Sequence, residues 1–268
     1  MTRILCLVAL SLSLVTACSD NTTDVTSGGK TWLGSILSNV DFDGVIASVD
    51  TANVNAVLLL SQNYSEFQDW YNSSNISSYT EHEATISFRP TIDSATTITD
   101  ISVNGTSLEI PSKSAAWGFN TNGLQSNFSS GSSTNSITKT NSDAALGTID
   151  TSVVFGERVR FSGFNRLDTI DISTGKTINF TGAGGYMQIT ILVTHPDDPQ
   201  ESGSHSITKI FHANSTVTLS SGDLGGLVSG KADVMVIKYD PKTVTTSSGK
   251  KIIFVGKTAH SVSIYLVD

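Results

Sequence analysis

Residues 232–239, Ala-Asp-Val-Met-Val-Ile-Lys-Tyr, and residues 252–255, Ile-Ile-Phe-Val, decide the fold class of this chain. Both runs are nearly continuous in apolar side chains, several of them β-branched, which predicts strands that are covered on both faces. In residues 261–266 every second side chain is apolar, so a strand with one buried face follows.

The same alternation recurs toward the N-terminus. Apolar and polar side chains alternate in residues 84–88, and Pro90 stands where that strand would stop. The dipeptide Asn104-Gly105 separates two alternating runs and accepts positive φ, so it predicts a tight hairpin. Further short alternating runs lie at residues 159–161, 170–172, 178–180, 189–193 and 217–219.

Three other segments are less regular. Residues 54–60 are almost all apolar and favour a buried strand, although so short a run also fits a helix. Apolar side chains at helical spacing between residues 32 and 40 allow a short amphipathic helix. Residues 126–143 are rich in Ser, Asn, Thr and Gly, which predicts a long surface loop.

Many short strands, regular turn signals and no long helical period together predict an all-β fold. We expect two tandem Ig-like or fibronectin-like β-sandwiches, which follow a signal peptide and a flexible tether. The N-terminal β-rich domain spans residues 31–165 and the C-terminal Ig-like sandwich spans residues 166–268.

The N-terminus resembles the signal peptide of bacterial lipoproteins. One positive charge, Arg3, precedes an apolar run over residues 4–15, and the small residues Thr16 and Ala17 stand directly before Cys18. The apolar run is shorter than the roughly 20 residues that a membrane-spanning helix needs. The resemblance implies that residues 1–17 are removed and that Cys18 becomes acylated, for example by palmitate.

An acylated Cys18 would anchor the protein to membrane lipid, because each buried methylene contributes about 0.8 kcal/mol. Residues 18–30 then form a flexible tether. Ser19 resembles the sorting pattern for the outer membrane, and we expect that location, on either its periplasmic or its cell-surface face. The mature chain would hold no free thiol, because Cys6 leaves with the signal.

The charge pattern argues against nucleic acid as a partner. The formal net charge is −8, and no basic cluster is denser than Lys250-Lys251. Binding to phosphate backbones depends on lysines and arginines that neutralise phosphates.

A resemblance to a wider family covers residues 84–268. Residues 101–105, Ile-Ser-Val-Asn-Gly, resemble a hairpin common in exported bacterial lipoproteins, and residues 176–181 and 215–219 resemble strands of Ig-like domains in the same proteins. The resemblance implies tandem Ig-like sandwiches in a family without an assigned activity.

Catalytic and metal-binding motifs are sparse. The sequence has no Gly-x-Ser-x-Gly pentapeptide, and His205 lies between two serines that a strand would point to the opposite face. Asp197, Asp198 and Glu201 could gather around calcium, but a solvated hairpin loop explains them better. No transition-metal site and no cofactor is expected.

Glycines 182, 184 and 185 follow a strand as in a phosphate-binding loop, yet no helix pattern or Lys-Ser/Thr pair comes after them. A bend or bulge in a β protein is the better interpretation.

Three aromatic residues raise the question of sugar binding. Ser65 and Gln68 fit a capping box, which predicts one helical turn that carries Trp70 and Tyr71. These two rings and Trp117 offer flat faces for stacking on a glycan, although packing in the core is the commoner use of such residues.

The sequence therefore predicts a lipid-anchored envelope protein that is not an enzyme and acts as a structural or binding module for a glycan or protein ligand. The alternative is a carbohydrate-binding or adhesive surface lipoprotein. A third possibility is an envelope hydrolase.

Overall fold

The described part of the chain is nearly all β, which confirms the predicted all-β sandwich class. The computed structural model describes residues 54–69, 72–88, 100–107, 117–120, 134–142, 146–198, 203, 205–212 and 215–268. The elements are β1 (Val54–Asp69), β2 (Asn72–Phe88), β3 (Ile101–Val103), β4 (Thr106–Ser107), β5 (Trp117–Asn120), β6 (Thr134–Lys139), β7 (Ile149–Val154), β8 (Arg160–Ser162), β9 (Thr169–Asp171), β10 (Lys176–Thr181), β11 (Tyr186–Pro196), β12 (Ser206–His212), β13 (Thr216–Leu219), α4 (Ser221–Leu224), β14 (Gly230–Thr245) and β15 (Lys251–Val267).

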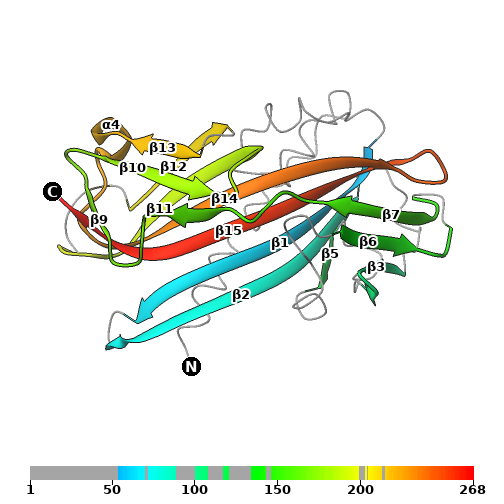
Figure 1. The fold of residues 1–268 in the computed structure, drawn as a ribbon, viewed down its shortest axis with the longest axis horizontal. Coiled ribbons are helices and arrows are strands. Elements are labelled where there is room, and N and C mark those ends of the chain that lie inside the picture. Colours follow the sequence, from blue (N-terminus) through cyan, green and yellow to red (C-terminus); the bar gives the residue numbers. More distant parts are fainter. Residues whose placement is uncertain are drawn as a thin grey trace.

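One large twisted sheet forms the long axis of the molecule (Figure 1). Its strand order is β12-β11-β14-β15-β1-β2-β5. The hairpins β1–β2 and β14–β15 are antiparallel, whereas β1 and β15 pair in parallel. Near Glu66, β1 leaves the side of β15, and β9 takes its place beside residues 265–267.

Two smaller sheets cover the two ends of one face of this large sheet, which we call the inner face. The sheet β13-β10-β8 closes the first core, whose members include Ile189, Val234 and Ile264. The sheet β4-β3-β6-β7 closes the second core, whose members include Leu58 and Phe254. The long strand β15 supplies side chains to both cores.

The two predicted sandwiches therefore correspond to two cores, but the chain is not divided between them at residue 165. β1 lies before that boundary and β15 after it, and they pair from Val54 to Glu66. The facing layer instead changes from one core to the other between Phe155 and Val159. Sequence patterns missed this sharing because β15, a strand of 17 residues, reads as two separate short strands.

Two local predictions are wrong. Residues 65–68 belong to β1 and pair with β2, so the capping box does not start a helical turn. The predicted loop over residues 126–143 contains β6, which pairs with β3 and β7. In both places the partner strand determines the conformation and overrides the local signal.

The predicted hairpin at Asn104-Gly105 is confirmed. It joins β3 to β4, and its two residues have φ values of 50° and 81°, as a tight turn with two left-handed residues requires. The Asn104 side chain accepts a hydrogen bond from the Ser136 N–H at 2.8 Å, so the turn is also fixed to β6.

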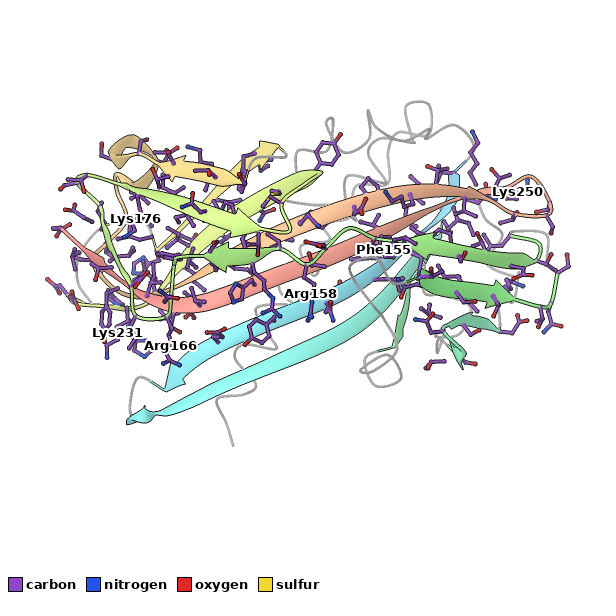
Figure 2. All side chains as sticks on the ribbon, viewed as in Figure 1. Phe155, Arg158, Arg166, Lys176, Lys231 and Lys250 are labelled. Atoms are coloured by element: carbon purple, nitrogen blue, oxygen red, sulfur yellow. The ribbon has the colours of Figure 1, made fainter. Side chains whose placement is uncertain are left out.

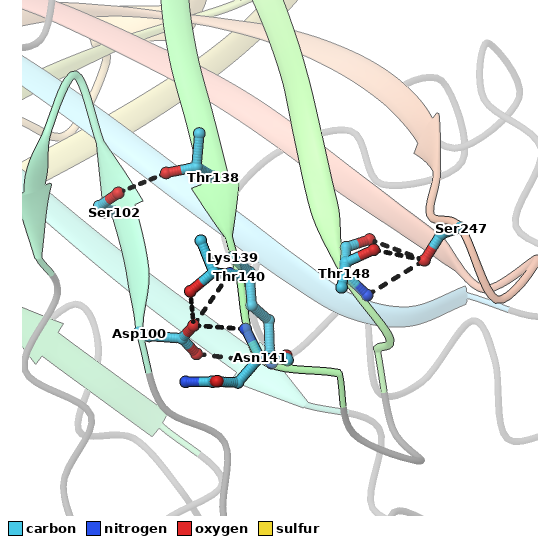
Figure 3. Close-up of polar contacts among 8 residues, drawn as sticks. All are labelled: Asp100, Ser102, Thr138, Lys139, Thr140, Asn141, Thr148 and Ser247. Atoms are coloured by element: carbon cyan, nitrogen blue, oxygen red, sulfur yellow. Dashed lines mark hydrogen bonds and ion pairs between the residues drawn. The ribbon is translucent and has the colours of Figure 1, made fainter.

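Asp100 fixes the same small sheet at its other end (Figure 3). Its carboxylate accepts hydrogen bonds from the Thr140 N–H and Oγ1 and from the Asn141 N–H. The buried Lys139 ammonium lies 3.6 Å from it. These contacts lower the pKa of Asp100 to about 2, the Thr140 side-chain bond contributing most. The same view shows Thr148 bonded to Ser247 of the β14–β15 connection.

Candidate functional site at the waist

A band of polar side chains interrupts the inner face between the two apolar cores. We call this band the waist. Along β15 the inner positions are apolar at residues 252 and 254 and again from residue 262, but they are Gly256, Thr258 and His260 between them. The register continues the band onto β14 and β1. Its other side chains are Gln62, Tyr64, Glu66, Lys238 and Asp240.

The chain crosses the waist between Phe155 and Arg160, over the middle of the large sheet (Figure 2). It is held by side chains of β15, which accept hydrogen bonds from its backbone. The Val159 N–H donates to Thr258 Oγ1 at 3.3 Å, and the Phe161 N–H donates to His260 Nδ1 at 3.0 Å. Thr258 and His260 thus replace the ladder bonds that an adjacent strand would make.

His260 is enclosed on several sides. Its side chain is 7% exposed, and the rings of Tyr64 and Phe161 lie 5.2 and 5.1 Å from it, centroid to centroid. Its Nε2 makes no hydrogen bond, and Glu66 Oε1 lies 3.7 Å away. The guanidinium of Arg160 stacks on the Tyr64 ring at 4.9 Å. Strands β1, β8 and β15 therefore meet at one buried imidazole.

The surroundings of His260 favour its neutral form. Burial lowers its pKa below the usual 6.5, Arg160 lowers it further, and Glu66 acts in the opposite direction. Because Nδ1 accepts the Phe161 N–H, the neutral ring carries its proton on Nε2. A second proton would have to sit on Nδ1, where it would break that bond.

Lys238 organises the other half of the waist. Its buried ammonium donates to the carbonyl oxygens of Glu157 and Gly182, so one side chain of β14 binds both the crossing segment and the end of β10. Burial lowers the pKa of Lys238, while Asp240 and Glu157 act to raise it. Asp240 in turn accepts the Gly156 N–H at 2.6 Å.

A pocket of about 310 Å³ opens beside these contacts, lined by Lys238, Asp240, Gly156, Glu157 and the bend at residues 182–185. The bend follows β10 as predicted, and Gly182 has a φ of 65°. The Lys238 ammonium donates its hydrogen bonds to backbone carbonyls, so its role here is to hold the fold together. The glycine bend therefore closes a hydrogen-bonded junction.

The waist has a carboxylate–imidazole pair, which is the usual means of general base catalysis. The ring faces, however, are covered by Tyr64 and Phe161, and Nδ1 is occupied by a backbone N–H. The arrangement is therefore suited to joining the layers.

Most of the predicted site residues are not brought together. Cys18, Trp70, Tyr71 and Glu201 lie outside the described residues, as do the signal peptide and the tether. Asp197 and Asp198 follow β11 and are exposed. Among the described residues no group of three potential metal ligands is found, and no helix has the length and hydropathy needed to cross a membrane.

Trp117 lies in a short strand at the edge of the large sheet. It begins β5, and its backbone pairs with Ser87 near the end of β2. Trp70 and Tyr71 precede Asn72, where β2 begins. At about 3.4 Å per residue, roughly 50 Å of strand separates Asn72 from Ser87.

Comparisons with known proteins leave the family open. No family model and no curated protein matches the chain. Among solved structures it resembles the yeast delta-COP-I mu-homology domain, with 9% identity, coverage of 80% of this chain and 98% of that one, and a TM-score of 0.25. A chimeric titin Z1Z2 carrying an exogenous decorin peptide gives 13% identity, 81% and 99% coverage, and a TM-score of 0.15.

Proposed function

We propose that the chain is a lipid-anchored protein of the outer membrane that acts without catalysis, as a rigid structural or binding module. The observation that supports the proposal best is the hairpin β14–β15, which runs unbroken through both cores. A strand of 17 residues spans roughly 55 Å, so the described body is a stiff rod.

The enclosed chemistry of the waist supports a role without catalysis. Two of its ionisable side chains, His260 and Lys238, form hydrogen bonds with backbone groups of the crossing segment. Rigidity along the axis suits a protein that holds a binding surface at a fixed distance from a membrane. The lipobox-like segment that ends at Cys18 provides the anchor in this proposal.

Fractionation of cells that express the full chain tests the anchor. We expect the parent protein in outer-membrane fractions and labelled by a palmitate analogue, whereas Cys18→Ala is unlabelled and leaves the membrane. Cys6→Ala is the matched control, because that residue lies within the predicted signal and should change neither result. Labelling that survives Cys18→Ala contradicts the proposal.

A carbohydrate-binding role is the second candidate, and one observation favours it. The hairpin β1–β2 extends past Glu66, the last residue of β1 that pairs with β15, and Trp70 and Tyr71 connect its two strands. If this connection binds glycans, Trp70→Ala should lose binding on a glycan array while Trp117→Ala keeps it. Equal binding by the parent and both variants would exclude the aromatic residues.

A further inference from the structure

The crossing segment is attached to the large sheet through side chains of β14 and β15. Three of its N–H groups are accepted by these side chains: Gly156 by Asp240, Val159 by Thr258 and Phe161 by His260. A carboxyl group keeps an acceptor oxygen when it is protonated, whereas an imidazolium has no acceptor left. Among these three acceptors, His260 is therefore the one that a proton removes completely.

The two ring nitrogens of His260 have different surroundings. Nδ1 accepts the Phe161 N–H at 3.0 Å. Nε2 carries the proton of the neutral ring and makes no hydrogen bond, and Glu66 Oε1 lies 3.7 Å from it. That separation is too long for a good hydrogen bond, but it lies within the range of an ion pair. The neutral ring thus binds the crossing segment and leaves a carboxylate beside its other nitrogen.

The charged neighbours of His260 are divided between the two layers. Glu66 belongs to β1 of the large sheet, as does Tyr64, whose ring stacks on the imidazole. Arg160 stands at the end of the crossing segment, where β8 begins. A positive charge on the imidazole would be attracted to the sheet by Glu66 and repelled from the segment by Arg160. Both forces therefore favour separation of the two layers at this point.

Strand β14 places an apolar side chain against the same ring. Val236 lies opposite His260 in the register. Lys238, two residues further along β14, lies opposite Thr258 and donates to backbone carbonyl oxygens. Of the described residues, Glu66 and Arg160 are thus the charged groups that determine how the imidazole responds to a proton.

We propose that His260 makes the waist an acid-sensitive switch, which is closed while the imidazole is neutral and is opened by protonation at Nδ1. In the closed state the imidazole accepts the Phe161 N–H. In the open state both ring nitrogens are donors, so the Phe161 N–H has to move away and the imidazolium pairs with Glu66. The acceptor of the open state is therefore already in place in the closed structure.

The switch opens as the pH falls. Burial and Arg160 hold the pKa of His260 below 6.5 in the closed state, and release of the segment lets it return toward that value. The closed state is thus fully favoured above about pH 6.5 and loses this preference below it. Because β8 belongs to the sheet β13-β10-β8, opening loosens that layer from the large sheet. The switch depends on neither the lipid anchor nor a ligand.

Hydrogen exchange followed by mass spectrometry tests the switch in the full chain. The protection factor, which is the intrinsic exchange rate at each pH divided by the measured rate, is compared for residues 156–162 and for residues 187–193 of β11. Between pH 7 and pH 5 we expect residues 156–162 to lose about tenfold in protection while residues 187–193 keep theirs. In His260→Asn the amide oxygen accepts the Phe161 N–H at both pH values, so the loss should disappear.

Glu66→Gln distinguishes a switch from a histidine that only fills space. The variant keeps the closed contact, so protection at pH 7 should match that of the parent. The open state loses its partner, so the fall in protection should move to lower pH. The exposed His205 provides the matched control, since His205→Asn should behave as the parent does.

Equal protection of residues 156–162 at pH 7 and pH 5 in the parent overturns the proposal. So does a loss that persists in His260→Asn, or one that Glu66→Gln leaves at the same pH. Simultaneous loss at residues 187–193 means global unfolding and also contradicts a local switch. If His260→Asn is unprotected at residues 187–193 already at pH 7, it does not fold, and His260→Gln takes its place.

Discussion

His260 and Asp233 show how single ionisable residues are used on the two faces of the sheet. The imidazole is held in its neutral form and accepts a backbone N–H, and the half-buried carboxylate accepts a hydrogen bond from a serine hydroxyl. The sequence gives little sign of either role. Only the break in apolar alternation at residues 256–260 could have pointed to the waist, and it needs the partner strands to be interpreted.

His260 should make stability fall at acidic pH. Its folded pKa lies below the unfolded value of about 6.5, so its contribution is present above that pH and is lost as the pH falls. The charged groups facing it are Glu66 from β1 and Arg160 from β8. The amide oxygen of His260→Asn can still accept the Phe161 N–H. We expect this variant to show a smaller change in the free energy of unfolding, measured in urea, between pH 7 and pH 5.

Asp233 has the opposite effect on the pH dependence of stability, because its pKa is raised. The protein with His260 and the His260→Asn variant are therefore compared with Asp233→Asn present in both. The exposed His205 provides the control, because His205→Asn should leave the slope unchanged. A slope that survives His260→Asn contradicts the assignment.

Asp233→Asn should itself stabilise the protein at neutral pH. The folded pKa of about 6 lies above the unfolded 3.8, so the carboxyl favours folding at low pH and loses that contribution as the pH rises through 6. A shift of this size corresponds to about 3 kcal/mol at most, and partial solvent screening of the half-buried side chain reduces it. Urea titration at pH 7.5 should show a gain of about 1–2 kcal/mol that disappears at pH 3.5, whereas Asp198→Asn on the exposed loop shows none.

At the scale of elements, strand positions were predictable and strand lengths were not. Alternation located the strands of residues 84–88, 101–103, 178–180 and 261–266, because each has one apolar face. It failed at residues 65–69, where β1 continues because β2 is paired to it. A capping box stabilises only one helical turn, and the strand pairing along the whole β1–β2 hairpin contributes more free energy.

The bend after β10 provides a test at this scale. Gly182 has a φ of 65°, and a Cβ added there would overlap the carbonyl oxygen of Arg158 in the crossing segment. Gly163 has a similar φ of 68°, but a Cβ there would meet nothing within 4 Å. We expect Gly163→Ala to cost about 1 kcal/mol of backbone strain and Gly182→Ala to cost at least 2 kcal/mol more. Equal losses in urea titration would show that the bend does not contact the crossing segment.

Lys238 tests the same junction from the other side. Lys238→Met removes the donor to the carbonyls of Glu157 and Gly182 and leaves both without that partner. We expect a loss of about 2–3 kcal/mol in chemical unfolding. Lys242→Met, on the same strand, serves as the matched control, because Lys242 is 46% exposed and makes a surface ion pair with Asp240.

For the whole molecule, the sequence predicted the all-β sandwich class but could not predict that the two inner cores share strands. The sharing depends on the parallel pairing of β1 with β15, which are nearly 200 residues apart and carry no local signal of partnership. The anchor at Cys18 is the reverse case, since it rests on a short pattern at one end of the chain. The waist was only partly predictable. Its polar residues interrupt the apolar pattern of β15, but they become neighbours of residues from other strands only after the long strands have paired.

The central claim is that the large sheet makes the rod one rigid body, and calorimetric unfolding tests it most directly. Leu60→Ala weakens the core under β3 and β6, and Ile189→Ala weakens the core under β10. Each should lower the melting temperature of one shared transition, with equal calorimetric and van't Hoff enthalpies. Two transitions, each shifted by only one of the variants, would instead show two independent sandwiches and contradict the account.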